Sequence, residues 1–185
     1  MKIICFGDSL TFGHGLALKD KWHVIAAKKT GVQMVNRGVS GNTTTEMLAR
    51  FNRQVILMQP DAVMIMGGYN DIFFEGSYEK AQKNIATMID MAQDKRIKVI
   101  AAVPPPIKAP IKFFDKTKEL NFNIRMVNEY LDWLRIFIAN RNLPLIDFSS
   151  EIEWLTQDLY LDGIHPNAKG NELMANKVIS FLTKF

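Results

Sequence analysis

Short apolar runs alternate with longer amphipathic segments along this chain. Five of the runs have the length of a strand, and a turn-forming residue follows most of them. The predicted strands cover residues 3–6, 32–35, 62–66, 97–103 and 143–148. Between them, apolar residues recur every three or four positions, as on the buried face of a helix. The chain therefore has a βαβαβαβαβα pattern.

Helices are predicted in most of the stretches between these strands. After a loop over residues 11–21, they cover residues 22–29, 43–58, 116–141 and 168–183. A further helix follows Ser77, which is a residue type that caps helices. Two of the helices show a clear inner face, formed by Met47, Leu48, Phe51, Val55 and Met58 in one and by Ile85, Met88, Ile89 and Ala92 in the other.

The alternation predicts an α/β fold with a parallel sheet. Parallel strands need crossover connections, which are right-handed and place helices on both faces of the sheet. A chain of 185 residues can bury a core of its own. We see no repeat, linker or low-complexity segment, so residues 1–185 are expected to form a single domain with a five-stranded parallel sheet.

Composition and charge narrow the possible partners. The net charge of +4 is modest and the basic residues are spread out, which favours solvated faces over a nucleic-acid-binding surface. We find no signal peptide and no transmembrane stretch, and therefore expect a cytoplasmic protein without stable membrane insertion.

The single cysteine, Cys5, lies in the first apolar run and is expected to be a core residue. No His/Cys cluster has metal-ligand spacing, so no metal or cofactor is predicted.

A candidate nucleophile follows the first predicted strand. Ser9 comes just after Gly7 and Asp8, and ligands bind at the carboxyl ends of the strands in such sheets. Serine and aspartate after a strand are also common as turn or cap residues. A nucleophilic serine needs a base, and the base needs an orienting carboxylate. Asp162 and His165 can supply both from one short segment, because Gly163 between them permits a tight turn.

Other strand exits carry polar or small residues. Asn70 follows the third strand, and its uncharged amide suits the stabilisation of an oxyanion, although an Asx cap would also explain it. The second exit, residues 38–43, contains two glycines that allow a ligand to approach the backbone. His14 and His23 have no carboxylate partner pattern, and His14 is the better candidate to line a pocket because it lies near Ser9.

These four segments together resemble the GDSL, or SGNH, hydrolase superfamily of esterases and lipases. The matching blocks, in order, are Gly7-Asp8-Ser9-Leu10-Thr11, Gly38-Val39-Ser40-Gly41, Gly68-Tyr69-Asn70-Asp71 and Asp162-Gly163-Ile164-His165-Pro166. The resemblance implies a flavodoxin-like three-layer α/β/α sandwich. It also implies a catalytic triad of Ser9, His165 and Asp162, and an oxyanion hole formed by Ser9, Gly41 and Asn70.

The expected activity is that of a serine ester hydrolase. The family includes carboxylesterases, lysophospholipases, thioesterases and deacetylases of sugars. Because the predicted loops are short, we expect an open site that takes a small-molecule ester with a small or short-chain acyl group. Residues 107–114 and 72–74 could line an acyl pocket or pack in the core. A carbohydrate O-deacetylase is the first alternative, and a non-catalytic flavodoxin-like binding module is the second.

Overall fold

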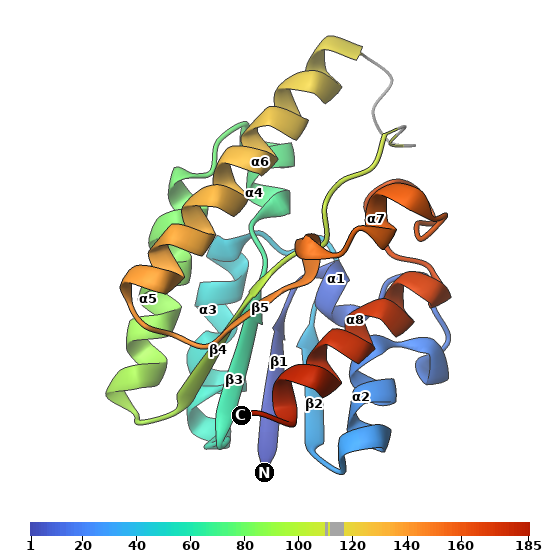
Figure 1. The fold of residues 1–185 in the computed structure, drawn as a ribbon. Helices are drawn as coiled ribbons and strands as arrows, with labels where there is room; N and C mark the ends of the chain where they lie inside the picture. Colours follow the sequence, from blue (N-terminus) through green and yellow to red (C-terminus); the bar gives the residue numbers. More distant parts are fainter. Residues whose placement is uncertain (110, 112–116) are drawn as a thin grey trace.

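Strands and helices alternate along the computed structural model, which describes residues 1–109, 111 and 117–185 (Figure 1). The strands are β1 (Lys2–Gly7), β2 (Gln33–Gly38), β3 (Ala62–Met66), β4 (Lys98–Val103) and β5 (Leu145–Asp147). The α-helices are α1 (Ser9–Phe12), α2 (Trp22–Thr30), α3 (Thr44–Gln54), α4 (Tyr69–Glu75), α5 (Glu79–Asp94), α6 (Thr117–Asn140), α7 (Glu153–Thr156) and α8 (Ala168–Leu182). Three short 3₁₀ turns are η1 (Leu18–Asp20), η2 (Ile56–Met58) and η3 (Phe148–Ser150).

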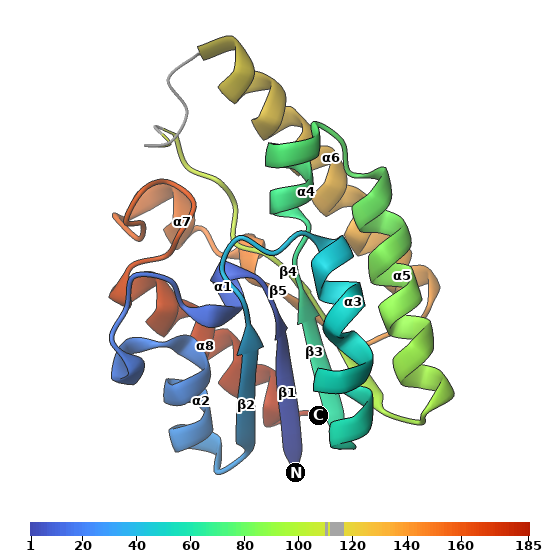
Figure 2. The same ribbon diagram turned by 180° about the vertical axis from the view of Figure 1, so that it is seen from behind.

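The five strands form one parallel sheet in the order β2-β1-β3-β4-β5. Helices α2 and α8 pack together on one face, and α3, α5 and α6 cover the other (Figures 1 and 2). This arrangement confirms the predicted fold class, an α/β sandwich of three layers around a five-stranded parallel sheet.

The core lies on both faces of the central strands. Residues 3–6 of β1 are fully buried, and residues 62–66 of β3 are at most 3% exposed. Apolar residues at every position, rather than at alternate ones, are the mark of a strand with both faces covered. Cys5 is fully buried within β1, as expected of a core residue. In the described part of the chain, no helix is both long and apolar enough to cross a membrane.

The exits of β1, β2 and β3 meet at one edge of the sheet. Strand β1 lies between β2 and β3, with Gly7 paired to both Gly38 and Met66. Both glycines are needed for close packing. A Cβ on Gly7 would lie 2.2 Å from the carbonyl oxygen of Met66, and one on Gly38 would lie 2.3 Å from the amide nitrogen of Phe12. The crevice where the strand order reverses is where open α/β sheets bind ligands.

Two predicted elements, a strand and a helix, differ most from the structure in their bounds. Strand β2 extends to Gly38 because residues 36–38 pair with residues 5–7 of β1. The helix predicted over residues 43–58 ends at Gln54, and η2 follows it. Val55 leaves the helical conformation, with φ −123° and ψ −62°. As a result Met58 is 41% exposed, and its placement on the inner face was wrong.

Several short helices lie in stretches that the sequence pattern left as loops. Helices α1, α4 and α7 have 4, 7 and 4 residues, which is too short to establish a helical repeat of apolar positions. The N-cap of α5 is Tyr78 rather than Ser77. Of the possible acyl-pocket stretch 107–114, residues 110 and 112–114 lie outside the described residues. Within it, Ile111 is buried and Ile107 packs against the core.

Candidate active site

Ser9 opens helix α1 directly after strand β1. Asp8 is the N-cap of this helix, and its Oδ1 accepts a hydrogen bond of 2.9 Å from the backbone N–H of Leu10. Ser9 is 8% exposed and lines a cavity. The sharp turn from strand into helix thus directs the Ser9 side chain to the carboxyl edge of the sheet.

The segment between α7 and α8 presents Asp162 and His165 together. Gly163, with φ +92°, makes the tight turn that the sequence predicts. Asp162 Oδ1 accepts hydrogen bonds from the backbone N–H groups of Ile164 (2.9 Å) and His165 (2.8 Å). Its Oδ2 lies 2.7 Å from His165 Nδ1. Burial alone would raise the pKa of Asp162, but these hydrogen bonds outweigh burial and the pKa lies below its usual value.

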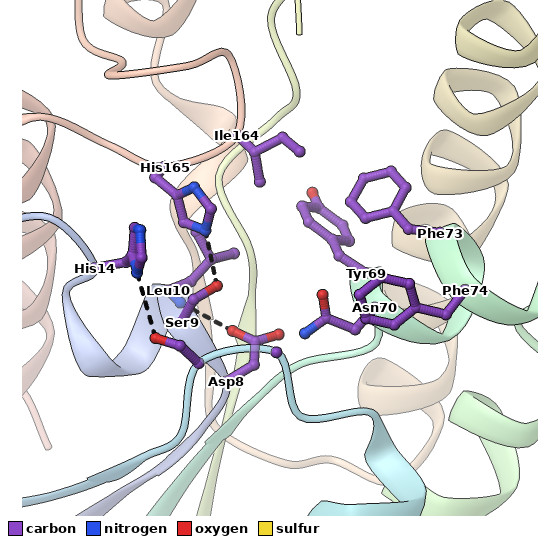
Figure 3. A pocket seen from close by; sticks show the side chains of 12 residues that line it. Asp8, Ser9, Leu10, His14, Tyr69, Asn70, Phe73, Phe74, Ile164 and His165 are labelled. Carbon is purple, nitrogen blue, oxygen red and sulfur yellow. Dashed lines mark hydrogen bonds between the residues drawn. The ribbon is translucent and has the colours of Figure 1, made fainter. Parts of the chain in front are cut away.

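Ser9 completes a chain of two hydrogen bonds that begins at Asp162. The ionised carboxylate accepts the Nδ1 proton of His165, which leaves Nε2 without a proton and able to accept one. Nε2 lies 2.9 Å from Ser9 Oγ (Figure 3). Residues that are 156 positions apart in the sequence are therefore in direct contact.

Asn70 and Gly41 face the same space from two other strand exits. Asn70 lies in the first turn of α4, and its Nδ2 donates a hydrogen bond of 2.8 Å to the carbonyl oxygen of Asn42. Gly41 lies in the loop after β2 with φ +81°, a backbone conformation that favours glycine. Gly41 and Asn70 line one cavity together with Ser9 and His165, whereas Asp162 is not among the lining residues.

This cavity has a volume of about 440 Å³. One wall is apolar and comes largely from helix α4, with Tyr69, Phe73 and Phe74 arranged around Asn70 (Figure 3). Leu10 and Ile164 complete the apolar lining. Of the candidate pocket residues 72–74, Ile72 is instead fully buried in the core, whereas Phe74 is 69% exposed.

The two remaining histidines differ in their surroundings. His14 lines the cavity, as the sequence suggests, and its ring centroid lies 4.6 Å from that of His165. His23 is buried at the start of α2, where its ring nitrogens lie 3.2 and 3.3 Å from Asn36 Nδ2. Burial, with a smaller contribution from Lys21, lowers the pKa of His23 to about 4. His23 is therefore a neutral structural residue.

Arg50 is a site-supporting residue that the sequence analysis did not identify. From α3 its guanidinium donates hydrogen bonds of 2.7 Å to the carbonyl oxygens of Gly7 and Arg37 and to Asn42 Oδ1. It thereby joins the exits of β1 and β2 to the loop that carries Gly41. A cation at one position of an amphipathic helix is not distinctive in sequence, so only the tertiary contacts reveal this role.

Comparisons with known proteins agree with this geometry. Residues 5–173 match the model of the GDSL-like lipase/acylhydrolase family. The chain is 28% identical over 178 residues to thioesterase 1/protease 1/lysophospholipase L1 of Escherichia coli, covering 94% of this chain and 79% of that protein. It is 25% identical over 154 residues to an acetylxylan esterase of Geobacillus stearothermophilus, covering 78% and 69%.

A solved structure supports the same assignment at the level of the whole fold. A member of the lipolytic G-D-S-L family from Veillonella parvula superposes with a TM-score of 0.86, at 26% identity and with 100% of both chains covered. The fold and the matched sequence blocks therefore point to the same family. The chain belongs to the GDSL-like lipase/acylhydrolase family and is an enzyme that hydrolyses ester bonds.

Proposed function

We propose that this protein hydrolyses small acyl esters through a triad of Ser9, His165 and Asp162. The observation that carries the proposal is the hydrogen-bonded chain from Asp162 Oδ2 through the His165 ring to Ser9 Oγ. It supplies the nucleophile, its base and the group that orients the base, in the geometry that acyl transfer requires.

The reaction has two halves. In the first, Ser9 Oγ bonds to the ester carbonyl carbon while its proton passes to His165 Nε2. Collapse of the tetrahedral intermediate breaks the bond to the alcohol oxygen, which takes that proton and leaves. In the second, water attacks the acyl-enzyme and gives a proton to His165, which returns it to Ser9 as the acid departs. Asp162 stabilises the imidazolium in both halves.

The negative oxygen of each tetrahedral intermediate needs hydrogen-bond donors. The backbone N–H groups of Ser9 and Gly41 and the amide of Asn70 are the proposed donors. Asn70 Nδ2 has two hydrogens, and only one is used by the bond to the carbonyl oxygen of Asn42. That bond holds the amide in place before the substrate arrives, and preorganised donors stabilise a transition state most effectively.

The cavity favours a short apolar acyl group. Its volume of about 440 Å³ must hold the ester and part of the alcohol as well as the acyl chain. Ligand pockets range from about 300 to 1,000 Å³, so this one is at the small end. The acyl groups that we propose are therefore short, with the aromatic side chains of α4 as their partners.

Deacetylation of a carbohydrate is a second candidate. The similarity to an acetylxylan esterase favours this candidate, since the aligned region covers 78% of this chain. An acetyl group would occupy only a part of the apolar wall, whereas a butanoyl or hexanoyl group would use more of it. The two candidates therefore differ in the acyl length that gives the highest kcat/KM.

The test is a panel of p-nitrophenyl esters from acetyl to decanoyl, with acetylated xylan alongside and Ser9→Ala as the control. We expect the highest kcat/KM at butanoyl or hexanoyl and no measurable hydrolysis by Ser9→Ala. A fluorophosphonate probe should label the wild type at Ser9 but not the variant. Full activity in Ser9→Ala would refute the proposed nucleophile. A preference for acetylated xylan over every acyl ester would select the second candidate.

A further inference from the structure

The cavity has two chemically different sides, with Ser9 between them. Tyr69, Phe73 and Phe74 form the apolar side, as Figure 3 shows. His14 lies on the opposite side of Ser9, next to the ring of His165 (Figure 3). His14 Nδ1 lies 3.5 Å from the hydroxyl of Ser40, a residue of the loop after β2 that also lines the cavity.

Both polar groups are open to incoming molecules. His14 and Ser40 are exposed side chains, so their remaining hydrogen-bonding atoms face solvent or a ligand. An imidazole and a hydroxyl can each donate and accept hydrogen bonds. The separation of 3.5 Å is at the long limit of a hydrogen bond, and such a weak contact costs little to exchange for a bond to a substrate.

The proposed reaction decides which part of the ester meets these groups. The alcohol oxygen must receive its proton from His165 Nε2, so the alcohol leaves from beside the His165 ring. The ring centroid of His14 lies 4.6 Å from that of His165. The alcohol portion is thus within reach of His14 and Ser40, while the acyl portion has the aromatic side chains of α4 as its partners.

We propose that His14 and Ser40 form an alcohol subsite that selects neutral, hydroxyl-bearing alcohols such as glycerol or a sugar. This inference rests on the proposed function. The described residues that line the cavity include no lysine or arginine, so a phosphate on the alcohol would lack a fixed cation there. A hydroxyl group, in contrast, finds an imidazole and a hydroxyl that can each donate and accept hydrogen bonds.

The experiment compares three butanoyl esters that differ only in the alcohol: 1-butanoylglycerol, ethyl butanoate and 1-butanoylglycerol 3-phosphate. The measured quantity is the ratio of kcat/KM for the glycerol ester to that for the ethyl ester. Because kcat/KM reports the steps up to loss of the alcohol, this ratio measures how strongly the enzyme prefers one alcohol portion over the other. We expect it to fall about five- to tenfold in His14→Leu and about two- to fivefold in Ser40→Ala, as for the loss of one neutral hydrogen bond.

Leucine keeps the bulk of the His14 side chain beside His165 and removes only its polar atoms. Ser180→Ala, an exposed serine near the end of α8, is the matched control and should leave the ratio unchanged. The wild type should hydrolyse the glycerol ester faster than its phosphate. An unchanged ratio in both His14→Leu and Ser40→Ala, or faster hydrolysis of the phosphate ester, would overturn the inference.

Failure of the inference is distinguishable from failure of the proposed function. If Ser9→Ala abolishes hydrolysis of p-nitrophenyl butanoate but the alcohol ratio changes in neither His14→Leu nor Ser40→Ala, only the alcohol subsite is refuted. If Ser9→Ala keeps its activity on that ester, the proposed function fails, and the alcohol subsite that rests on it fails as well.

Discussion

Asp8 and Asp162 are two carboxylates close to Ser9 that their surroundings affect in opposite ways. Asp8 is 1% exposed, and burial, together with the nearby charge of Asp71, raises its pKa to about 7. The hydrogen bond from the Leu10 N–H and the positive charge of Arg50 lower this pKa, but by less than burial raises it. Asp162 accepts three hydrogen bonds, which keep its pKa below the usual value. Asp162 is therefore ionised at neutral pH and suited to stabilise an imidazolium, whereas burial favours the neutral form of Asp8.

Asp8 is predicted to make stability fall as pH rises. Its pKa of about 7 in the folded protein lies above the ordinary value of 3.8, so the folded state binds more protons than the unfolded state between these values. The associated stability is complete below pH 4 and is lost as pH rises to about 7. Asparagine can still accept from the Leu10 N–H but does not ionise.

We therefore expect the free energy of unfolding of Asp8→Asn, relative to that of the wild type, to be higher at pH 8 than at pH 5. The expected change in this difference is on the order of 2 kcal/mol. Urea unfolding at both pH values measures it. Asp61→Asn, at an exposed position before β3, provides the control for a general effect of removing a charge. An equal difference between Asp8→Asn and wild type at both pH values would contradict the prediction.

Asn70 is predicted to act on kcat much more than on stability. Asn70→Ala removes one proposed oxyanion donor, and such a loss lowers kcat by about 10²–10³-fold. The fold should persist, because Asn70 is only partly buried. Steady-state kinetics on p-nitrophenyl butanoate and a thermal melt separate the two effects. Asn52→Ala, at an exposed position on α3, should match the wild type in both measurements.

The turn from β1 into α1 depends on close packing of Gly7 against β3 and α1. Gly7 has no unusual φ, so its role is not conformational freedom. A Cβ there would lie 2.2 Å from both the carbonyl oxygen of Met66 and the hydroxyl oxygen of Thr11. Neither the neighbouring strand nor the following helix could keep its position.

Gly7→Ala is therefore expected to destabilise the protein by about 3 kcal/mol or more, since overpacking forces the backbone apart. Gly31→Ala is the comparison, because a Cβ at Gly31 meets nothing within 4 Å and only the positive φ of +71° is strained. That strain costs about 1–2 kcal/mol. Urea unfolding of both variants measures which one loses more free energy of unfolding. A loss in Gly7→Ala that is equal to or smaller than that in Gly31→Ala would refute the packing argument.

At the scale of the whole molecule, tyrosine hydroxyls link the two halves of the site to the exit of β4. Tyr69, on the helix that carries Asn70, donates to the carbonyl oxygen of Pro105 at 2.7 Å. Tyr160, just before Asp162, donates to the carbonyl oxygen of Pro106. Two adjacent proline carbonyls thus set the position of α4 relative to the Asp162–His165 segment.

Tyr160→Phe is predicted to lower kcat several-fold with little change in KM, because it removes only a hydroxyl that positions the segment of His165. It should also reduce the free energy of unfolding by about 1 kcal/mol, as for one lost hydrogen bond. Tyr78→Phe is the matched control, since the Tyr78 hydroxyl contacts Glu129 on α6 and does not line the cavity. Equal kcat values for Tyr160→Phe and Tyr78→Phe would contradict the positioning role.

Much of the fold was predictable because its signals are local. The fully apolar run of β3 was predicted with its correct bounds, and the glycine after α2 marks the end of that helix in a left-handed conformation. Errors arose where contacts between distant segments decide the outcome. Strand β2 is longer than its apolar run because its last residues pair with β1, and α4 is too short for its period to be recognised.

The alternation of strands and helices and the Asp162–His165 turn were predictable from the amino-acid sequence alone. These depend on apolar spacing and on the chemistry of a few adjacent residues. Only the three-dimensional arrangement brings His165 Nε2 to Ser9 Oγ, lets Arg50 join two strand exits, and makes α4 the apolar wall of the cavity. Such contacts depend on the strand order and on packing between segments far apart in the chain, which no local pattern encodes.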